Sequence, residues 1–346
     1  MAHLVTTPAR DTVLVQSNEA DRNRLLTFRR DQSSAALVPA DPVATAGAGS
    51  GVPHLASQGS VTLSSGGDAV FVTNAGSGDV SLLTFTDRGP VLVQVAKTGG
   101  MPVSVAERDG LLYVLDSAGA SLTGFTWQPD GLQPVPGQRR DWDPHGAPAQ
   151  VGFSPDGRHL VVTERAADRI VVFPVDTSGA LGQPVFHASS GVTPYGFGFT
   201  SAGVLVVTEA FGGEAEKSAV SSYVIADGSL TPISATVRNG RTALCWAAVS
   251  PNGRTAYAAN YGDGTVSRYD ISADGALTLT GPAVDVANNQ SPGLRDLDLS
   301  PDGRHLYAID ADSGHLLGWN VDQSGDLTRS DHLSGLPSTA AGIAAS

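Results

Sequence analysis

The chain has 346 residues, of which 41% are hydrophobic and 16% are charged, and its formal net charge at pH 7 is −13. This acidic balance argues against binding to nucleic acid or to an anionic membrane, because both depend on clustered Lys and Arg. A single cysteine, Cys245, excludes an intrachain disulfide and is expected to pack as a buried, inert thiol. The 41 glycines and 21 prolines are typical of a chain built from short strands and tight turns.

No stretch of the sequence reaches the roughly 18 apolar residues of a membrane-spanning helix. The first ten residues, MAHLVTTPAR, are expected to be flexible and lack the apolar core of a signal peptide. This slightly favours a cytoplasmic location, although a leader removed earlier would leave no trace here. We expect a monomer whose partner is a small molecule.

A short string recurs along the chain. Residues 154–160 and 300–306 both read SPDGRHL, and residues 250–256 read SPNGRTA. Ser250 lies 96 residues after Ser154, and Ser300 lies 50 residues after Ser250, which fits two periods of about 48 residues and one of 50. A repeat of this length that consists of strands indicates a β-propeller.

In chain order, residues 11–46 contain three predicted strands (TVLVQSN, RLLTFRR and LVPADPVA) but lack a first, inner strand. Six complete blades of four strands follow, and Val and Ile enrichment with period-two alternation favours strands over helices in each. These blades are predicted over residues 59–99, 102–137, 147–187, 194–237, 243–286 and 293–336.

The last segment, STAAGIAAS, resembles an inner strand with nothing after it, and its Gly342-Ile343 matches Gln150-Val151. The sequence therefore predicts an all-β fold with one domain over residues 1–346. This domain would be a seven-bladed propeller, closed by one blade that the N- and C-terminal strands share. Such closure leaves no free sheet edge.

Two passages carry a family resemblance: FSPDGRHLVV followed by ADRIVVFPVD, and LSPDGRHLYAID followed by GHLLGWNVDQSGDL. They are similar to the seven-bladed propeller lactonase family, which includes bacterial 6-phosphogluconolactonases and fungal carboxymuconate-lactonizing enzymes. The resemblance covers about residues 11–346. It is more specific for the fold than for the substrate, because SPDG turns occur in many unrelated propellers.

The resemblance implies active residues on the inner strands and on the loops after the second strands. The family histidine before the first SPDG falls at Ala149, with His145 four residues earlier, and the family Pro-Arg pair of the next blade reads Pro194-Tyr195. The family glutamate matches Glu209. Another family arginine falls at Tyr261, and the Pro-Arg of the last full blade persists as Arg295.

These departures bear on the substrate. Guanidinium groups bind phosphate or carboxylate through two parallel hydrogen bonds, so replacing two arginines with tyrosines removes charge and adds aromatic surface. A phosphorylated sugar lactone or a tricarboxylate is therefore disfavoured, and a small, mostly neutral organic molecule fits better.

The strand alignment predicts that Tyr195, Trp246, Tyr261, Arg295 and Glu209 converge at one end of a central funnel, as small-molecule pockets combine aromatics with a few polar groups. Within this site we assign Glu209 as general base and Arg295 as the group that stabilises an oxyanion. Tyr195, Trp246, Tyr261, His145 and Arg165 are assigned to substrate binding.

Each assignment has a structural alternative. Tyr195 and Trp246 are equally expected as core between blades, Glu209 as a cap on backbone N–H groups, and Arg295 as a partner that neutralises Asp296 and Asp298. Arg165, with Glu164, is alternatively a surface pair of little energetic value.

Other kinds of site find little support. Residues 141–145 (DWDPH) contain plausible metal ligands, but their spacing fits no metal motif, so no metal or cofactor is assigned. A G-x-S-x-G nucleophile elbow at a strand-to-helix turn is also missing from the sequence. The leading hypothesis is lactone hydrolysis or the reverse cyclisation. A non-catalytic binding or scaffold propeller and a biosynthetic cyclase or isomerase remain as alternatives.

Overall fold

The computed structural model describes residues 6–31, 36–281, 284–285 and 293–346, and these are almost entirely antiparallel β-sheet. Their only helical segments are two short 3-10 turns, η1 (Pro144–Gly146) and η2 (Phe211–Gly213). In this part of the chain no helix has the length and apolar character needed to span a membrane. The strands divide between two compact units, here called the N-terminal unit (Met1–Pro144 and Thr339–Ser346) and the C-terminal unit (His145–Ser338).

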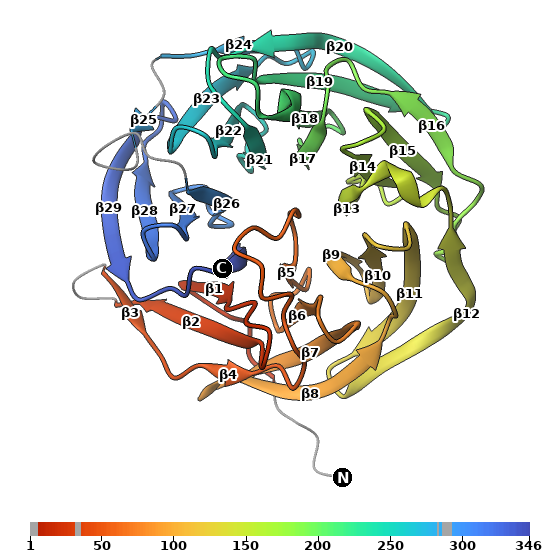
Figure 1. Cartoon of the computed structure of the whole chain (residues 1–346), viewed down its shortest axis with the longest axis vertical. Helices are drawn as coiled ribbons and strands as arrows, with labels where there is room; N and C mark the ends of the chain where they lie inside the picture. The colour runs from red at the N-terminus through yellow and green to blue at the C-terminus, as the bar shows by residue number, and fades with distance from the viewer. Residues whose placement is uncertain (1–5, 32–35, 282–283, 286–292) are drawn as a thin grey trace. The chain divides into compact units, whose positions relative to one another are not determined.

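The N-terminal unit contains three sheets (Figure 1). The first has the order β3-β2-β1-β30, with β4 beside β2, and the other two are β5 to β8 and β9 to β12 in chain order. The strands of the first sheet are β1 (Thr12–Gln16), β2 (Arg24–Arg30), β3 (Leu37–Pro39), β4 (Val43–Ala44) and β30 (Ala341–Ala345). Those of the second are β5 (Val61–Leu63), β6 (Ala69–Asn74), β7 (Asp79–Thr86) and β8 (Gly89–Lys97). Those of the third are β9 (Pro102–Arg108), β10 (Leu111–Asp116), β11 (Ser121–Gln128) and β12 (Gly131–Asp141).

The C-terminal unit contains four sheets with their strands in chain order, except that β25 lies beside β23. The first two comprise β13 (Pro148–Phe153), β14 (His159–Glu164), β15 (Arg169–Pro174), β16 (Val185–Ala188), β17 (Pro194–Phe199), β18 (Leu205–Glu209), β19 (Ala219–Ala226) and β20 (Ser229–Arg238). The last two comprise β21 (Leu244–Val249), β22 (Thr255–Asn260), β23 (Thr265–Ile271), β24 (Leu277–Leu279), β25 (Val284–Asp285), β26 (Leu294–Leu299), β27 (His305–Asp310), β28 (His315–Val321) and β29 (Leu327–Ser334). The seven sheets over the described residues confirm the predicted fold class, a seven-bladed propeller.

The two ends of the chain share one sheet, because β30 pairs antiparallel with β1. The Thr339 hydroxyl donates a hydrogen bond to the Ser17 carbonyl at 2.7 Å, and the Ser346 amide donates to the Thr12 carbonyl at 2.9 Å. Figure 1 places the C-terminus beside β1. The inner strand predicted for STAAGIAAS is therefore present, while closure of a ring by this strand stays a prediction.

The start of the chain is partly held in place. Thr7 donates a backbone hydrogen bond to the Phe85 carbonyl at 2.9 Å, and Ala9 donates one to the Gly67 carbonyl at 2.7 Å. Residues 6–10 thus contact the N-terminal unit, whereas residues 1–5 of the segment expected to be flexible lie outside the described residues. The end of the blade predicted over residues 243–286, at Val286, lies outside them too.

The repeated SPDG and SPNG strings form the turns between first and second strands. In each turn the serine hydroxyl accepts a hydrogen bond at 3.0 Å from the amide five residues later: His159, Thr255 and His305. The same hydroxyl donates to the Asp or Asn two residues later, at 2.6–2.7 Å. The glycine has φ near +70° in all three turns, a conformation that side chains disfavour. This geometry explains why serine and glycine recur at a fixed spacing.

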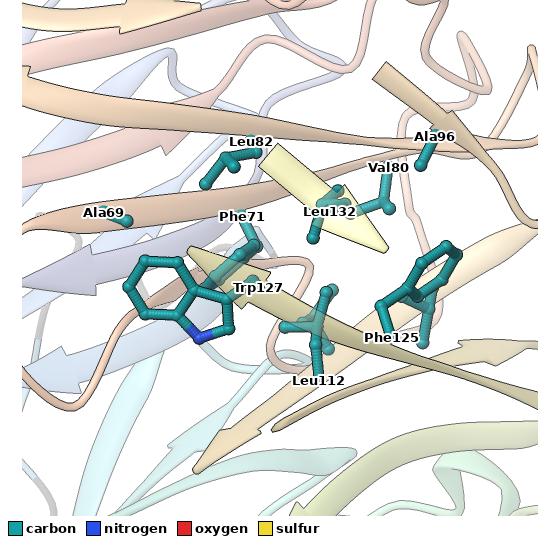
Figure 2. Close-up of a cluster of buried hydrophobic side chains, with 11 residues drawn as sticks. Ala69, Phe71, Val80, Leu82, Ala96, Leu112, Phe125, Trp127 and Leu132 are labelled. Atoms are coloured by element: carbon teal, nitrogen blue, oxygen red, sulfur yellow. The ribbon is translucent and has the colours of Figure 1, made fainter. Parts of the chain in front are cut away.

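Aliphatic and aromatic side chains between neighbouring sheets form the core. In the N-terminal unit, the facing sheets β5–β8 and β9–β12 bury a cluster that Figure 2 shows in close-up. The rings of Phe71 and Trp127 meet edge to face, with centroids 5.3 Å apart. The Trp127 indole donates a hydrogen bond to the Glu107 carboxylate at 2.9 Å, which satisfies its polar edge. Each sheet thus depends on its neighbour for burial of its apolar faces.

Deletion of residues 338–346 tests the role of β30. The deletion removes the hydrogen bonds between β30 and β1 together with the buried side chains of Ile343 and Ala344. We therefore expect the melting temperature to fall by about 10 °C or more. Thr339→Val is the matched control, since it removes one hydrogen bond and is expected to cost about 1 kcal/mol. Thermal unfolding followed by circular dichroism measures both. A deletion with an unchanged melting temperature contradicts a stabilising role for β30.

Candidate functional site

Every predicted site residue lies in the C-terminal unit, whose first strands β13, β17, β21 and β26 are neighbours in Figure 1. The residue second in each of these strands has the same register: Ala149, Tyr195, Cys245 and Arg295. Near this position every one of the four strands shifts register against its partner, as at a β-bulge. Bulges redirect side chains and are frequent beside functional sites. The four positions are therefore structurally equivalent in the four sheets, while the family roles transferred onto them stay predictions.

Tyr195 and Trp246 form a buried aromatic pair. Their ring centroids lie 5.5 Å apart at an interplanar angle of 63°, and their exposed fractions are 2% and 1%. The backbone that carries Tyr195 is held from the preceding sheet, where Thr163 donates to the Tyr195 carbonyl. In the same way, the Gln150 amide group accepts from the Phe197 amide at 2.7 Å and donates to the Phe197 carbonyl at 3.0 Å. The pair therefore bridges adjacent sheets and is rigidly placed.

Arg165, the first residue after β14, lies against this pair. Its Cζ is 5.5 Å from the centroid of the Tyr195 ring, within the range of a cation–π contact. The residue is half-buried, and its Nε has no hydrogen-bond partner among the described residues. Glu164, its neighbour in sequence, forms an ion pair with Arg169. Arg165 thus joins the aromatic pair instead of forming the surface pair with Glu164 that we considered.

The Tyr195 hydroxyl is buried and makes no hydrogen bond within the described part of the chain. Burial raises its pKa well above the ordinary value; Cys245 and Asp296 raise it further, while Arg165 and Arg295 lower it. The hydroxyl is therefore protonated at neutral pH and can donate a hydrogen bond. Burial also raises the pKa of Cys245 to about 12, and this confirms the buried, inert thiol.

Arg295 is buried, with 2% of its surface exposed, and its charge is compensated. Its Nη1 donates to the Ser338 carbonyl at 3.0 Å, and its Nη2 pairs with the Asp312 carboxylate. Its Cζ lies 5.8 Å from the Tyr261 ring centroid. The partner is thus Asp312, not the Asp296 or Asp298 that flank it in sequence. Sequence reasoning missed Asp312, and the only signal was its place two residues after the end of β27.

Glu209 ends β18 and is completely buried. Its Oε1 accepts hydrogen bonds from the Gly191 amide at 2.8 Å and the Ser221 hydroxyl at 2.5 Å. Burial raises its pKa, whereas the bonds from Ser221 and Gly191 lower it. A Cβ on Gly191 would lie 2.1 Å from Oε2, so the loop before β17 covers that oxygen. The capping role that we considered for Glu209 is therefore observed, and its role as a base stays a prediction.

The structure thus brings two Arg–Tyr pairs and one tryptophan together at the first strands. Glu209 pairs through its backbone with Pro194, the neighbour of Tyr195, while its carboxylate accepts hydrogen bonds from the Gly191 amide and the Ser221 hydroxyl. His145 is exposed on η1. No group of three or more His, Cys, Asp or Glu among the described residues is arranged to hold a metal ion.

A groove of about 1300 Å³ lies at the other ends of β21 and β26, lined by the turns Ser250–Thr255, Asp302–His305 and Asp322–Gly325. It contains none of the predicted site residues. The candidate site therefore rests on the Arg–Tyr pairs and not on this groove.

The pH dependence of stability tests the environment of Glu209. Folding raises the pKa of Glu209, so as pH rises the carboxyl of the unfolded chain ionises before that of the folded chain, from about pH 4.3 upward. Ionisation of the unfolded chain favours unfolding, and the wild type therefore loses stability through this group as pH rises. Glu209→Gln retains an oxygen for Gly191 and Ser221 and does not ionise. We expect its stability relative to the wild type to improve between pH 4.5 and 7 in urea unfolding experiments.

Glu209→Ala is the matched control for this series. It leaves a buried amide and a hydroxyl without an acceptor, so we expect a loss of about 1–3 kcal/mol at every pH. A Gln variant whose stability relative to the wild type does not change with pH contradicts the raised pKa.

Known families and structures show what this arrangement belongs to. The sequence model of the family described as "Lactonase, 7-bladed beta-propeller" matches residues 2–211 and 207–342. No curated protein matches the chain.

Similar solved structures include a candidate 6-phosphogluconolactonase of Bacteroides fragilis (20% identity, TM-score 0.72, covering 98% of this chain and 99% of that one). A protein of Lactobacillus plantarum is similar at 16% identity and TM-score 0.74, with 97% and 99% covered. The periplasmic gluconolactonase of Pseudomonas aeruginosa is similar at 19% identity and TM-score 0.53, with 98% and 86% covered. At these identities the solved structures show the fold alone, but the family match spans nearly the whole sequence, and the chain therefore belongs to the seven-bladed β-propeller lactonase family.

Proposed function

We propose that this protein hydrolyses a lactone, a small and mostly neutral organic molecule, at the first strands of the C-terminal unit. One observation carries the proposal: the contacts Arg165–Tyr195 and Tyr261–Arg295 lie where the family resemblance implies substrate-binding residues. They combine aromatic surface with placed guanidinium groups, as expected of a small-molecule site.

The choice of a neutral substrate follows from the charges of these residues. The Bacteroides fragilis protein is named for a phosphorylated sugar lactone and the Pseudomonas aeruginosa protein for gluconolactone, so the comparisons leave the charge of the substrate open. Arg295 already has Asp312 as its counterion, and tyrosines occupy two family arginine positions. A phosphate dianion would thus meet few uncompensated cations, and transferring it from water would be costly.

The reaction itself is a simple acyl transfer to water. The water oxygen adds to the acyl carbon, and the carbonyl π electrons move onto the oxygen to give a tetrahedral oxyanion. The bond between the acyl carbon and the ring oxygen then breaks. One proton of the water ends on the ring oxygen as a hydroxyl, and the other is released as the carboxylic acid ionises. Donors aimed at the developing oxyanion are the largest single contribution expected from the protein.

Glu209 enters the proposal with two distinguishable roles. As general base it would remove a proton from water, and burial, which raises its pKa, would make the carboxylate a stronger base. As a cap it holds the loop that leads into β17 and so positions Tyr195. The hydrogen bonds to Oε1 and the cover over Oε2 favour the second role.

A non-catalytic ligand-binding propeller is the second candidate. The observation in its favour is the same cover over Glu209, the one carboxylate that matches the family pattern. Such a protein would bind lactones or hydroxy acids without turning them over.

A lactone panel tests the proposal. We expect turnover of neutral lactones, such as glucono-1,5-lactone and dihydrocoumarin, to exceed that of 6-phosphogluconolactone, with acid release followed by a pH indicator. If Glu209 is the base, Glu209→Gln loses about 100-fold or more in kcat, whereas a cap leaves kcat within a few-fold. Absence of turnover on every lactone contradicts the hydrolase and favours the binding protein.

A further inference from the structure

We propose that Arg165 and Tyr195 together bind the acyl oxygen of the ligand: the carbonyl oxygen of the lactone and then the carboxylate of the hydroxy acid. This inference rests on the proposed function, and it moves the anion-binding role from Arg295 to Arg165.

The two Arg–Tyr contacts have the same geometry with the partners exchanged. In each, the residue just after the second strand of one sheet meets the second residue of the first strand in the next sheet. The first contact consists of Arg165 and Tyr195, and the second of Tyr261 and Arg295. The chain thus keeps one cation in each contact, although tyrosine occupies the position at which the family has an arginine.

The surroundings of the two cations differ. The Arg295 guanidinium is buried and bound by Asp312 and the Ser338 carbonyl, so its charge is already neutralised. Arg165 is half-buried and makes no ion pair among the described residues, whereas an Nε without a hydrogen-bond partner there is common to both arginines. Glu164, the nearest carboxylate in sequence, pairs with Arg169. Of the two arginines, Arg165 is therefore the one whose charge has no acidic partner in the described chain and can meet a ligand anion.

Tyr195 supplies a second donor beside it. Its hydroxyl has no partner in the described chain, and 2% of the residue is exposed. A buried hydroxyl without a hydrogen bond costs free energy, and this cost is removed when a ligand oxygen accepts from it. Trp246 packs against the Tyr195 ring at 5.5 Å and fixes its direction, so Trp246 acts as a positioning residue.

Two donors of this kind match one acyl oxygen. A guanidinium donates only, and a protonated phenol can donate beside it, so together they favour an oxygen that gains negative charge. A neutral lactone becomes such an anion in the transition state and in its product. A neutral substrate is therefore compatible with the positive charge of Arg165, because that charge acts on the oxyanion and on the carboxylate product.

Binding of a matched pair of ligands tests the inference without turnover. The probes are 3-(2-hydroxyphenyl)propanoate, the hydrolysis product of dihydrocoumarin, and its uncharged primary amide. We measure their Kd by calorimetry for the wild type, Arg165→Gln, Arg165→Lys and Tyr195→Phe. Arg158→Gln is the charge-matched control, because Arg158 is exposed in the first turn of the same sheet, at the far end of β14.

We expect the wild type to bind the carboxylate, and Arg165→Gln to bind it about 10- to 100-fold more weakly, with partial recovery in Arg165→Lys. Tyr195→Phe is expected to lose about tenfold. The amide is expected to respond to Tyr195→Phe but little to Arg165→Gln, and Arg158→Gln is expected to change neither Kd. Melting temperatures close to the wild type show that each variant is folded.

The outcomes separate this inference from the proposed function. Carboxylate binding that depends on Arg165 in a protein without turnover supports the inference and contradicts the hydrolase. Turnover and carboxylate binding that are unchanged in Arg165→Gln support the hydrolase and overturn the inference. A wild type that binds neither probe also overturns it, as does equal weakening of carboxylate and amide in Arg165→Gln.

Discussion

A buried polar side chain ends the second strand in each of the seven sheets that the described residues form, and the geometry of the site depends on it. These residues are Gln16, Asn74, Asp116, Glu164, Glu209, Asn260 and Asp310. A buried polar group must be hydrogen-bonded, and a loop that enters a sheet has backbone N–H groups in need of acceptors. Asp116 accepts from the Met101 amide, as Glu209 accepts from the Gly191 amide. The same bond thus satisfies the side chain and fixes where the first strand of the sheet begins.

This constraint also explains several glycines in the entering loops. A Cβ at Gly100, Gly146 or Gly191 would lie 1.6–2.1 Å from the carboxylate of Asp116, Glu164 or Glu209. Only a residue without a side chain lets the loop approach so closely. Because Tyr195 follows Gly191 by four residues, the position of a proposed ligand-binding group depends on a structural contact of Glu209. The Glu209 carboxylate can therefore match a family pattern and still serve to hold the backbone of the entering loop.

The two Arg–Tyr contacts differ in how their charge is arranged. In one contact the cation is Arg165, just after a second strand, and in the other it is Arg295, within a first strand. Only Arg295 has an acidic partner, Asp312. A propeller is a scaffold on which an arginine and a tyrosine can exchange positions with little loss of stability, because its loops tolerate change while its sheets persist. The similar solved structures, at 16–20% identity, share the sheets with this chain.

The sequence by itself determined the repeat, the strands of each blade and the inner strand at the C-terminus. It did so because serine, glycine and alternating apolar residues act locally: the Ser154 turn is closed by groups within five residues of each other. The register of Tyr195 and Arg295 also followed from the repeat. Only the tertiary structure decided which partners these side chains have. Asp312 on Arg295, Arg165 on Tyr195 and Gly191 on Glu209 are contacts between segments 17 to 30 residues apart, and the packing of sheets sets them, not the periodicity of the strands.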